Sequence, residues 1–273
     1  MVTPEFTKWA CSYAGCDCGD IESPIWLCGI EWGFSKEYGD THEQYSSKQN
    51  NYYAQALKNE IAKGGCEASK SNYFCDDHDE DPGGRLKYPY IRSAAKLLGA
   101  LKGWDINDLE VVKSRALNDN IFHINLYPIA FPHESDELWL ANSMPDVTGL
   151  ATKQLYRTWC MLNRFPWIAD QVEKHKPAVF IGTGIGYLAD FIVCCGGKRI
   201  IDNVKREEIT GDPNNPATTT RALYWARVNE KTILAVIPFF TGRYGLNSNE
   251  LIRKFGEGSK KSPNSRQKKE LSK

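Results

Sequence analysis

Four short, mostly apolar runs separated by longer stretches of helical periodicity dominate the hydrophobic pattern of this chain. The runs cover residues 25–29, 120–128, 177–182 and 232–237. Such runs are typical of strands that are buried on both faces of a sheet. Apolar residues repeat with a helical period over about 50–63, 89–101, 154–174, 188–193 and 249–256. The alternation predicts an α/β fold with three αβα layers around a central four-stranded, mostly parallel sheet.

Glycine, proline and capping residues predict where several of these elements end. Gly103 is expected to stop the second helix, and Pro128 to close the second strand. Pro166 is expected to bend the third helix, because proline removes a backbone hydrogen bond from a helix interior. Asn247 or Ser248 is expected to cap the last helix.

The polar stretches outside these elements predict the domain organisation. Residues 35–50, 64–88, 133–153 and 198–221 are interpreted as surface connections, and residues 1–23 as an irregular N-terminal segment. We therefore expect one domain over residues 1–256. Residues 257–273 carry six Lys or Arg against two Glu, which predicts a basic, disordered tail.

Composition narrows the functional class. The 273 residues are 41% hydrophobic and 25% charged, with a formal net charge of zero, which argues against a uniformly basic protein that coats nucleic acid. No apolar run is long enough to span a membrane, and the N-terminus lacks the pattern of a secretory signal. Nine cysteines, an odd number, favour reduced thiols. We expect a cytoplasmic or nucleoid-associated monomer with no membrane contact.

Two clusters raise the question of a bound metal ion. Cys11, Cys16 and Cys18, with Cys66 and Cys75, offer thiolates for zinc or an iron–sulfur cluster, but their spacing matches no standard ligand pattern. The acidic run 76–81 offers oxygen ligands for a hard cation, although a solvated loop is the simpler interpretation. The prediction is free thiols, no metal and no cofactor.

The turn after the third strand raises the question of a nucleotide cofactor. Residues 182–186 have glycines at alternate positions, in the order G-x-G-x-G. A dinucleotide-binding turn carries G-x-G-x-x-G and an acidic residue about twenty positions later, which is not evident here. A Rossmann-like nucleotide-binding enzyme therefore remains an alternative.

A parallel sheet brings the loops after its strands to one edge, where open α/β sheets bind ligands. The residues that the sequence places there are Glu31, Trp32, Gly33, Phe34, Asn125, Tyr127, the 182–186 turn, Phe239, Phe240 and Arg243. The set contains no Ser or Cys nucleophile beside a histidine, no phosphate-loop lysine and no carboxylate cluster. Esterase, kinase and two-metal nuclease activities are thus poorly supported. His123, inside the second run, is interpreted as a satisfied core histidine rather than a catalyst.

The same set suits the excision of a base from DNA. A lone carboxylate, Glu31, can orient water and stabilise a cationic sugar, as acids do in glycoside hydrolysis. Asn125 offers a donor and an acceptor for the polar edge of a pyrimidine. Aromatic side chains can stack on a flipped-out base or fill the space it leaves. Arg243, next to Gly242, suits a phosphate contact.

The order of these features resembles the uracil-DNA glycosylase superfamily. That family has a water-activating motif, GQDPY or GINPG, after the first strand, a base-reading Asn on a later strand, and an HPS- or NPS-type intercalating loop after the last strand. The corresponding stretches here are Gly29-Ile30-Glu31-Trp32-Gly33, Phe122-His123-Ile124-Asn125-Leu126 and Ile237-Pro238-Phe239-Phe240-Thr241-Gly242-Arg243. The resemblance implies a glycosylase-like fold over about residues 24–256, a DNA partner and no cofactor.

Departures from the family pattern bear on activity and substrate. Glu31 stands in place of Asp or Asn, and Ile237 in place of the polar His or Asn that stabilises the leaving base. Gly33 stands where uracil-specific members carry a tyrosine that excludes 5-substituted pyrimidines, as in the mismatch-specific GINPG-type branch. An alternative interpretation of Gly33 is a tight turn.

These features predict a divergent, monofunctional DNA glycosylase. Glu31 and Asn125 would be catalytic, whereas Trp32, Gly33, Phe34 and Tyr127 would bind the base. The DNA contacts would come from Phe239, Phe240 and Arg243, with core packing as the alternative for the two phenylalanines. The expected substrate is a 5-modified or mismatched pyrimidine, such as a modified cytosine of viral DNA, in base excision as antiviral defence. The main alternative is a catalytically inactive nucleic-acid-binding relative.

Overall fold

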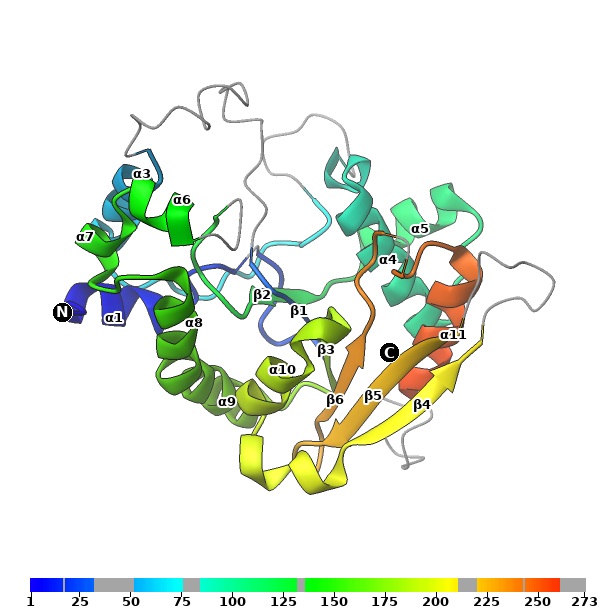
Figure 1. Ribbon diagram of the computed structural model, residues 1–273. Coiled ribbons are helices and arrows are strands. Elements are labelled where there is room, and N and C mark those ends of the chain that lie inside the picture. Colours follow the sequence, from blue (N-terminus) through cyan, green and yellow to red (C-terminus); the bar gives the residue numbers. More distant parts are fainter. Residues whose placement is uncertain are drawn as a thin grey trace.

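A computed structural model describes residues 1–16, 18–31, 52–75, 84–131, 136–210, 220–242 and 244–260. Its centre is one sheet with the strand order β2-β1-β3-β6-β5-β4 (Figure 1). The strands are β1 (Ile25–Gly29), β2 (Phe122–Asn125), β3 (Val179–Thr183), β4 (Lys205–Ile209), β5 (Arg221–Arg227) and β6 (Ile233–Ile237). The first four strands in this order are parallel, and β5 and β4 continue the sheet in antiparallel fashion.

The four predicted strands are present, but the prediction of a four-stranded sheet is wrong. Each predicted strand is buried along its whole length, which is why each appears as an apolar run. The β4 strand lies at the sheet edge, where four of its five residues are exposed and charged. Charged residues discourage pairing of a free edge with another chain, and they also hide the strand from a hydrophobic pattern.

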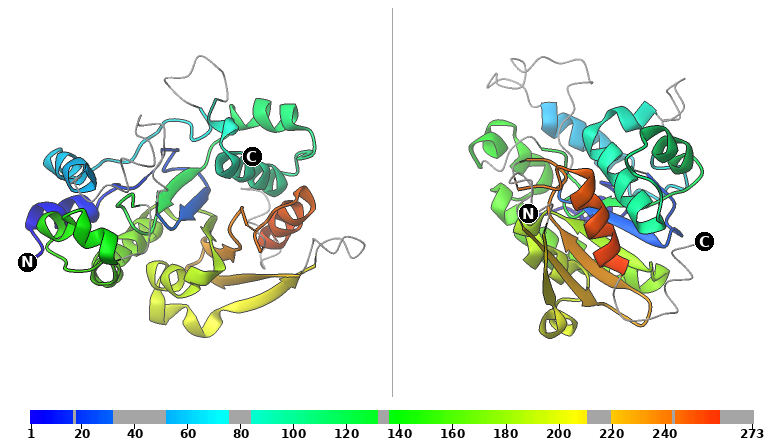
Figure 2. Two further views of the ribbon diagram at one scale, coloured as in Figure 1. Left: turned by 45° about the horizontal axis from the view of Figure 1, so that its top comes forward. Right: turned by 90° about the vertical axis from the view of Figure 1, so that its right-hand side faces the viewer.

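Helices cover both faces of the sheet and give the three predicted layers (Figure 2). They are α1 (Pro4–Ala10), α3 (Tyr52–Ala62), α4 (Pro89–Lys102), α5 (Leu109–Ala116), α6 (Asp136–Ala141), α7 (Met144–Thr148), α8 (Lys153–Leu162), α9 (Arg164–His175), α10 (Leu188–Cys194) and α11 (Asn249–Lys260). Short 3-10 turns are η2 (Gly84–Lys87), η3 (Ile185–Tyr187), η4 (Gly197–Arg199) and η5 (Ile201–Asn203). One face of the sheet carries a core cluster with Trp26 and Phe180, and the other carries one with Leu27 and Ile181.

Two helical predictions need correction. The N-terminal segment is not irregular throughout, because Thr3 caps α1 through a hydrogen bond from the Phe6 N–H and Pro4 is its first residue. The predicted helix 154–174 is divided at Asn163 rather than bent at Pro166. Pro166 lies in the first turn of α9, where a missing N–H costs no helical hydrogen bond.

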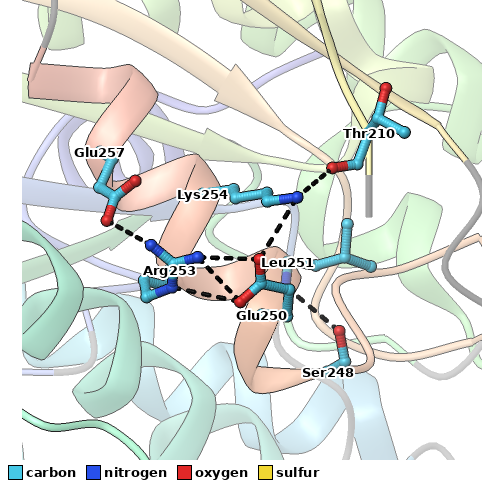
Figure 3. A network of polar contacts seen from close by, with 7 residues as sticks. All are labelled: Thr210, Ser248, Glu250, Leu251, Arg253, Lys254 and Glu257. Atoms are coloured by element: carbon cyan, nitrogen blue, oxygen red, sulfur yellow. Dashed lines mark hydrogen bonds and ion pairs between the residues drawn. The ribbon is translucent and has the colours of Figure 1, made fainter. Parts of the chain in front are cut away.

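The last helix runs past its predicted end at residue 256 and reaches Lys260. Ser248 caps it, as predicted, by accepting a hydrogen bond from the Leu251 N–H (Figure 3). Arg253 pairs with Glu250 at 2.8 Å and with Glu257 at 2.7 Å, so the ion pairs continue beyond the predicted boundary. The remaining tail, 261–273, lies outside the described residues.

Close packing of α11 on α4 generates a prediction about stability. A Cβ added at Gly256 would lie 2.5 Å from the Ala100 Cβ and 3.0 Å from its backbone carbonyl carbon. One at Gly258 would approach only the ends of flexible side chains, Leu223 at 3.2 Å and Ile209 at 3.5 Å. We expect Gly256→Ala to lower the free energy of unfolding by about 1–3 kcal/mol, because neither backbone can yield. In Gly258→Ala the gain in helix propensity, about 1 kcal/mol, should offset the cost of the close contact, so that the free energy of unfolding changes little. Urea denaturation of both variants checks this, and equal effects would contradict it.

Candidate functional site

A pocket of about 590 Å³ lies at the carboxyl ends of β1, β3 and β6. Its walls are Ile30, Glu31, Gly184, Ile185, Gly186, Tyr187, Pro238, Phe239, Thr241, Gly242, Tyr244 and Gly245. From β1 the chain first adds β2 on one side and later adds β3 on the other. The pocket therefore lies at the topological switch point, where open α/β sheets bind their ligands. The predicted convergence of loops is confirmed for three of the four strand ends.

Backbone hydrogen bonds fix the two glycine-containing walls. Gly184 has a φ of 120°, and its N–H donates to the Ile237 carbonyl at 2.8 Å, which joins the turn after β3 to the end of β6. Past β6, the Leu246 N–H donates to the Phe239 carbonyl at 2.8 Å and closes the loop. Gly242, with a φ of 86°, supplies a left-handed residue within that loop.

Glu31 lies at the pocket wall in an ion pair with Lys153. The Lys153 Nζ is 2.8 Å from the Glu31 Oε1, and the two side chains are 1% and 14% exposed. Lys153 is the first residue of α8, where the helix dipole disfavours a positive charge. The Glu31 carboxylate offsets that cost. Among the described residues of the wall, Glu31 is the only one with a charged side chain.

Sequence reasoning missed Lys153 because it lies in the stretch interpreted as a connection. Thr152 caps α8 by accepting a hydrogen bond from the Leu155 N–H, and Lys153 follows directly. A lysine in the first turn of a capped helix, where acidic residues are favoured, is the signal that could have pointed to a distant carboxylate.

Asn125 lies beside the pocket at the end of β2 but does not line it. Its side chain is 2% exposed, and its Nδ2 donates to the Gly15 carbonyl at 2.9 Å. A Cβ at Gly29 would overlap the Asn125 Oδ1. The absence of a side chain at Gly29, the last residue of β1, therefore lets the Asn125 amide lie close to the backbone of β1. One of the two N–H donors of the amide is thus used within the protein.

Arg164 holds the segment that positions Asn125. The side chain is fully buried at the start of α9. It donates hydrogen bonds to five backbone carbonyls, those of Ala10, Ser12, Ala14, Asn125 and Leu126. The guanidinium therefore ties residues 10–14 to the end of β2, next to the Gly15 carbonyl that accepts from Asn125.

Tyr127 lies behind the pocket wall instead of in it. It is 1% exposed, and its hydroxyl donates to the buried Asp190 carboxylate. Burial and the Asp190 hydrogen bond raise the pKa of the Tyr127 hydroxyl. The Arg157 guanidinium lies over the rings of Tyr127 and Tyr187, 5.1 and 5.0 Å from their centroids. Tyr127 thus supports the wall that Tyr187 forms, and in this geometry it has no surface on which a base could stack.

The loop after β6 separates the two predicted phenylalanines. Phe239 is 40% exposed and lines the pocket, whereas Phe240 is 3% exposed and packs in the core, 5.1 Å from the Tyr90 ring. A DNA wedge is therefore available only from Phe239. Ile237 is fully buried in the same core. Sequence reasoning missed Tyr187 and Tyr244, the other aromatic residues of the wall.

Four predicted site residues, Trp32, Gly33, Phe34 and Arg243, lie outside the described residues. Within the described ranges, no group of three or more His, Cys, Asp or Glu side chains is placed to hold a metal ion, and none of the nine cysteines forms a disulfide. The acidic run 76–81 also falls outside those ranges. No helix in the described part of the chain is long and apolar enough to cross a bilayer.

His123 is buried as predicted, but it is not satisfied. It is 3% exposed, and neither ring nitrogen has a hydrogen-bond partner. Its ring stacks on Tyr73 with centroids 5.0 Å apart. Burial, and to a lesser extent the charge of Arg85, lower the pKa of His123 to about 3. The imidazole is therefore neutral at physiological pH and serves as a flat packing surface.

Comparison with known proteins adds no relative to these observations: no family model, no curated protein and no solved structure matches the chain. The chemistry of the pocket is therefore the basis for a functional proposal.

The Glu31–Lys153 pair generates a prediction about coupling. We expect Glu31→Gln and Lys153→Met each to lower the free energy of unfolding by about 3 kcal/mol, because each leaves a poorly solvated charge. The double variant should lose much less than the sum, since it leaves no charge behind. The exposed pair Glu110–Lys113, 3.0 Å apart, is the matched control, with an expected coupling below about 1 kcal/mol. Strict additivity at Glu31 and Lys153 would contradict the pairing.

The buried His123 generates a prediction about acid stability. Because its folded pKa of about 3 lies below the ordinary value of 6.5, the unfolded chain binds the extra proton first as the pH falls. Stability that is complete above pH 6.5 is then lost progressively toward pH 3. We expect His123→Phe to remove this component, which is about 2 kcal/mol between pH 6.5 and 4.5. Urea denaturation of both proteins across this range measures it, and parallel pH profiles would refute it.

Proposed function

We propose that this protein is a DNA glycosylase that hydrolyses the N-glycosidic bond of a flipped-out, 5-modified or mismatched pyrimidine and leaves an abasic site. The observation that carries the proposal is the pairing of Glu31 with the buried Lys153 at the wall of an aromatic- and glycine-lined pocket. A modified cytosine of viral DNA is the proposed substrate class, and the protein would act as a monomer without a cofactor.

Glu31 has two proposed tasks in this reaction. Its carboxylate orients a water molecule toward the sugar carbon, and its negative charge stabilises the cationic sugar that forms as the base departs. Both tasks require the ionised form and a fixed orientation, and the Lys153 ammonium 2.8 Å away favours both. Because the Lys153 side chain is 1% exposed, water competes little for this ammonium.

The other walls suit a planar, uncharged ring. Phe239, Tyr187 and Tyr244 offer aromatic surfaces for stacking, and Tyr244 is 73% exposed at the pocket edge. Asn125 does not line the pocket and remains a predicted base contact, with its Oδ1 as the proposed acceptor for an N–H of the pyrimidine edge. Trp32, Gly33 and Phe34 follow Glu31 directly in the sequence and remain predicted base contacts, and Arg243 remains a predicted phosphate contact.

The loop after β6 forms the wall that we propose contacts the departing base. Ile237 ends β6 with its side chain in the core, so it is not a pocket residue that has lost a polar group. Among the described residues of this loop, the polar side chains at the pocket are those of Thr241 and Tyr244. We propose that they take over contacts to the leaving base.

A nucleotide-binding enzyme that uses the 182–186 turn is less well supported. Phosphate-binding turns aim their backbone N–H groups at the ligand. Here the Gly184 N–H donates to the Ile237 carbonyl, and the following helix, α10, has only seven residues. An inactive nucleic-acid-binding relative would keep the same pocket and differ only in catalysis.

The decisive experiment is excision from synthetic duplexes. Duplexes that contain uracil, mismatched thymine or 5-hydroxymethylcytosine are incubated with the protein, and abasic sites are then cleaved with alkali. We expect strand breaks with at least one of these duplexes and a loss of about 100-fold or more in Glu31→Gln, because the neutral amide neither orients the attacking water as a base nor stabilises the cationic sugar. Glu110→Gln, an exposed carboxylate on α5, should match the wild type.

Three results would count against the proposal. Breaks that survive Glu31→Gln would exclude Glu31 as the catalytic carboxylate. Specific DNA binding without breaks would favour the inactive relative. Thermal stabilisation by a mononucleotide, with no effect of DNA, would favour the nucleotide-binding enzyme.

A further inference from the structure

Gly186 is unusual among the glycines of the described ranges. An added Cβ would stand in open space at five of them: Gly64, Gly103, Gly186, Gly197 and Gly242. Four of these have a positive φ, which a side chain would strain, whereas Gly186 does not. Neither the backbone nor an atom of the other described residues therefore requires a glycine at position 186.

Local structure argues against a glycine at this position. Gly186 lies in the 3-10 turn η3, and glycine loses more conformational freedom in a helical turn than alanine does. Gly186 weakens its own turn and relieves no clash within the described structure. The reason for a glycine at this position therefore lies outside the folded chain, for example in a bound molecule that needs the space. Because Gly186 lines the pocket, a ligand can be that molecule.

The turn around Gly186 is held on both sides, so the open space is a lasting feature of the pocket. On one side, the Gly184 N–H donates to the Ile237 carbonyl at 2.8 Å. On the other, the Tyr187 ring packs under the Arg157 guanidinium, 5.0 Å from its centroid. Arg157 also lies 4.0 Å from the buried Asp190. These contacts anchor the residues that flank Gly186.

We propose that Gly186 determines specificity by keeping open the part of the pocket that receives a substituent on the base, so that the pocket accepts pyrimidines with a substituent larger than methyl. This inference rests on the proposed function of the pocket as a base site. The pocket volume of about 590 Å³ supports it. Pockets of roughly 300–1,000 Å³ bury drug-sized ligands, and an unsubstituted pyrimidine is a single six-membered ring.

The test compares Gly186→Ala, Gly186→Leu and the wild type on a small and a bulky base. The probes are duplexes with 2′-fluoroarabino thymidine in a mismatch, or with 2′-fluoroarabino cytidine that carries a glucosylated 5-hydroxymethyl group. The fluorine slows cleavage, so binding is measured separately from catalysis. Excision of the corresponding unfluorinated bases is measured in parallel. Ala62→Leu, at an exposed position in α3, controls for an added apolar side chain.

We expect Gly186→Leu to weaken binding of the bulky base by about tenfold or more and to change binding of thymine by less than about threefold, because the added side chain fills only the substituent space. Gly186→Ala should keep or raise the melting temperature, since its φ suits alanine. An unchanged or higher melting temperature would show that the turn tolerates a side chain at position 186. Ala62→Leu should bind both probes like the wild type.

The outcomes separate this inference from the proposed function. If the wild type excises bases but Gly186→Leu affects both probes equally, the inference is overturned and the glycosylase proposal stands. If nothing is excised but Gly186→Leu selectively weakens binding of the bulky base, the inference stands and the catalytic proposal fails. If neither probe binds better than an unmodified duplex, the inference is overturned.

Discussion

The arrangement of the site depends on one buried cation that has backbone carbonyls as its partners. Arg164 is fully buried and donates to the carbonyls of two separate segments, residues 10–14 and the end of β2. A guanidinium can serve so many acceptors because its donors are rigid and lie in one plane. Without it, these buried carbonyls would lose their hydrogen bonds, and each loss costs about 1–3 kcal/mol. The contact converts an N-terminal loop into a support for Asn125.

The second buried cation, Lys153, pairs with a carboxylate, whereas Arg164 binds backbone carbonyls. Lys153 has the Glu31 carboxylate as its ion-pair partner, and that carboxylate borders a pocket. A buried ion pair gains little net free energy over an apolar pair of similar size, because desolvation opposes the attraction. Its presence at a pocket wall is therefore better explained by the orientation that it imposes on Glu31 than by stability. Arg164 thus supports the scaffold, whereas Lys153 orients the Glu31 carboxylate.

The sequence predicted those parts of the fold in which burial leaves a local pattern. The strands β1, β2, β3 and β6 are buried on both faces, so they are visible as apolar runs, whereas the exposed, charged β4 is not. Glu31 was predicted to lie at the ligand-binding edge of the sheet because it comes two positions after the end of a buried strand. Lys153 was missed because 122 positions separate it from Glu31 and no local pattern connects them. Adjacent residues such as Phe239 and Phe240 differ only in the direction that the loop gives them, which composition does not encode.

The parallel pairing of the sheet has a consequence for the order in which the protein assembles during synthesis. Trp26 is in register with Phe122 and with Phe180, so β1 leaves the ribosome long before either neighbour exists. Such distant pairings slow folding, because a long loop must close before any contact forms. The pocket forms later than these pairings, since its walls include residues from Ile30 to Gly245. A nascent chain therefore exposes the apolar strand β1 until β2 and β3 have been made, and its pocket can form only after Gly245 has been synthesised.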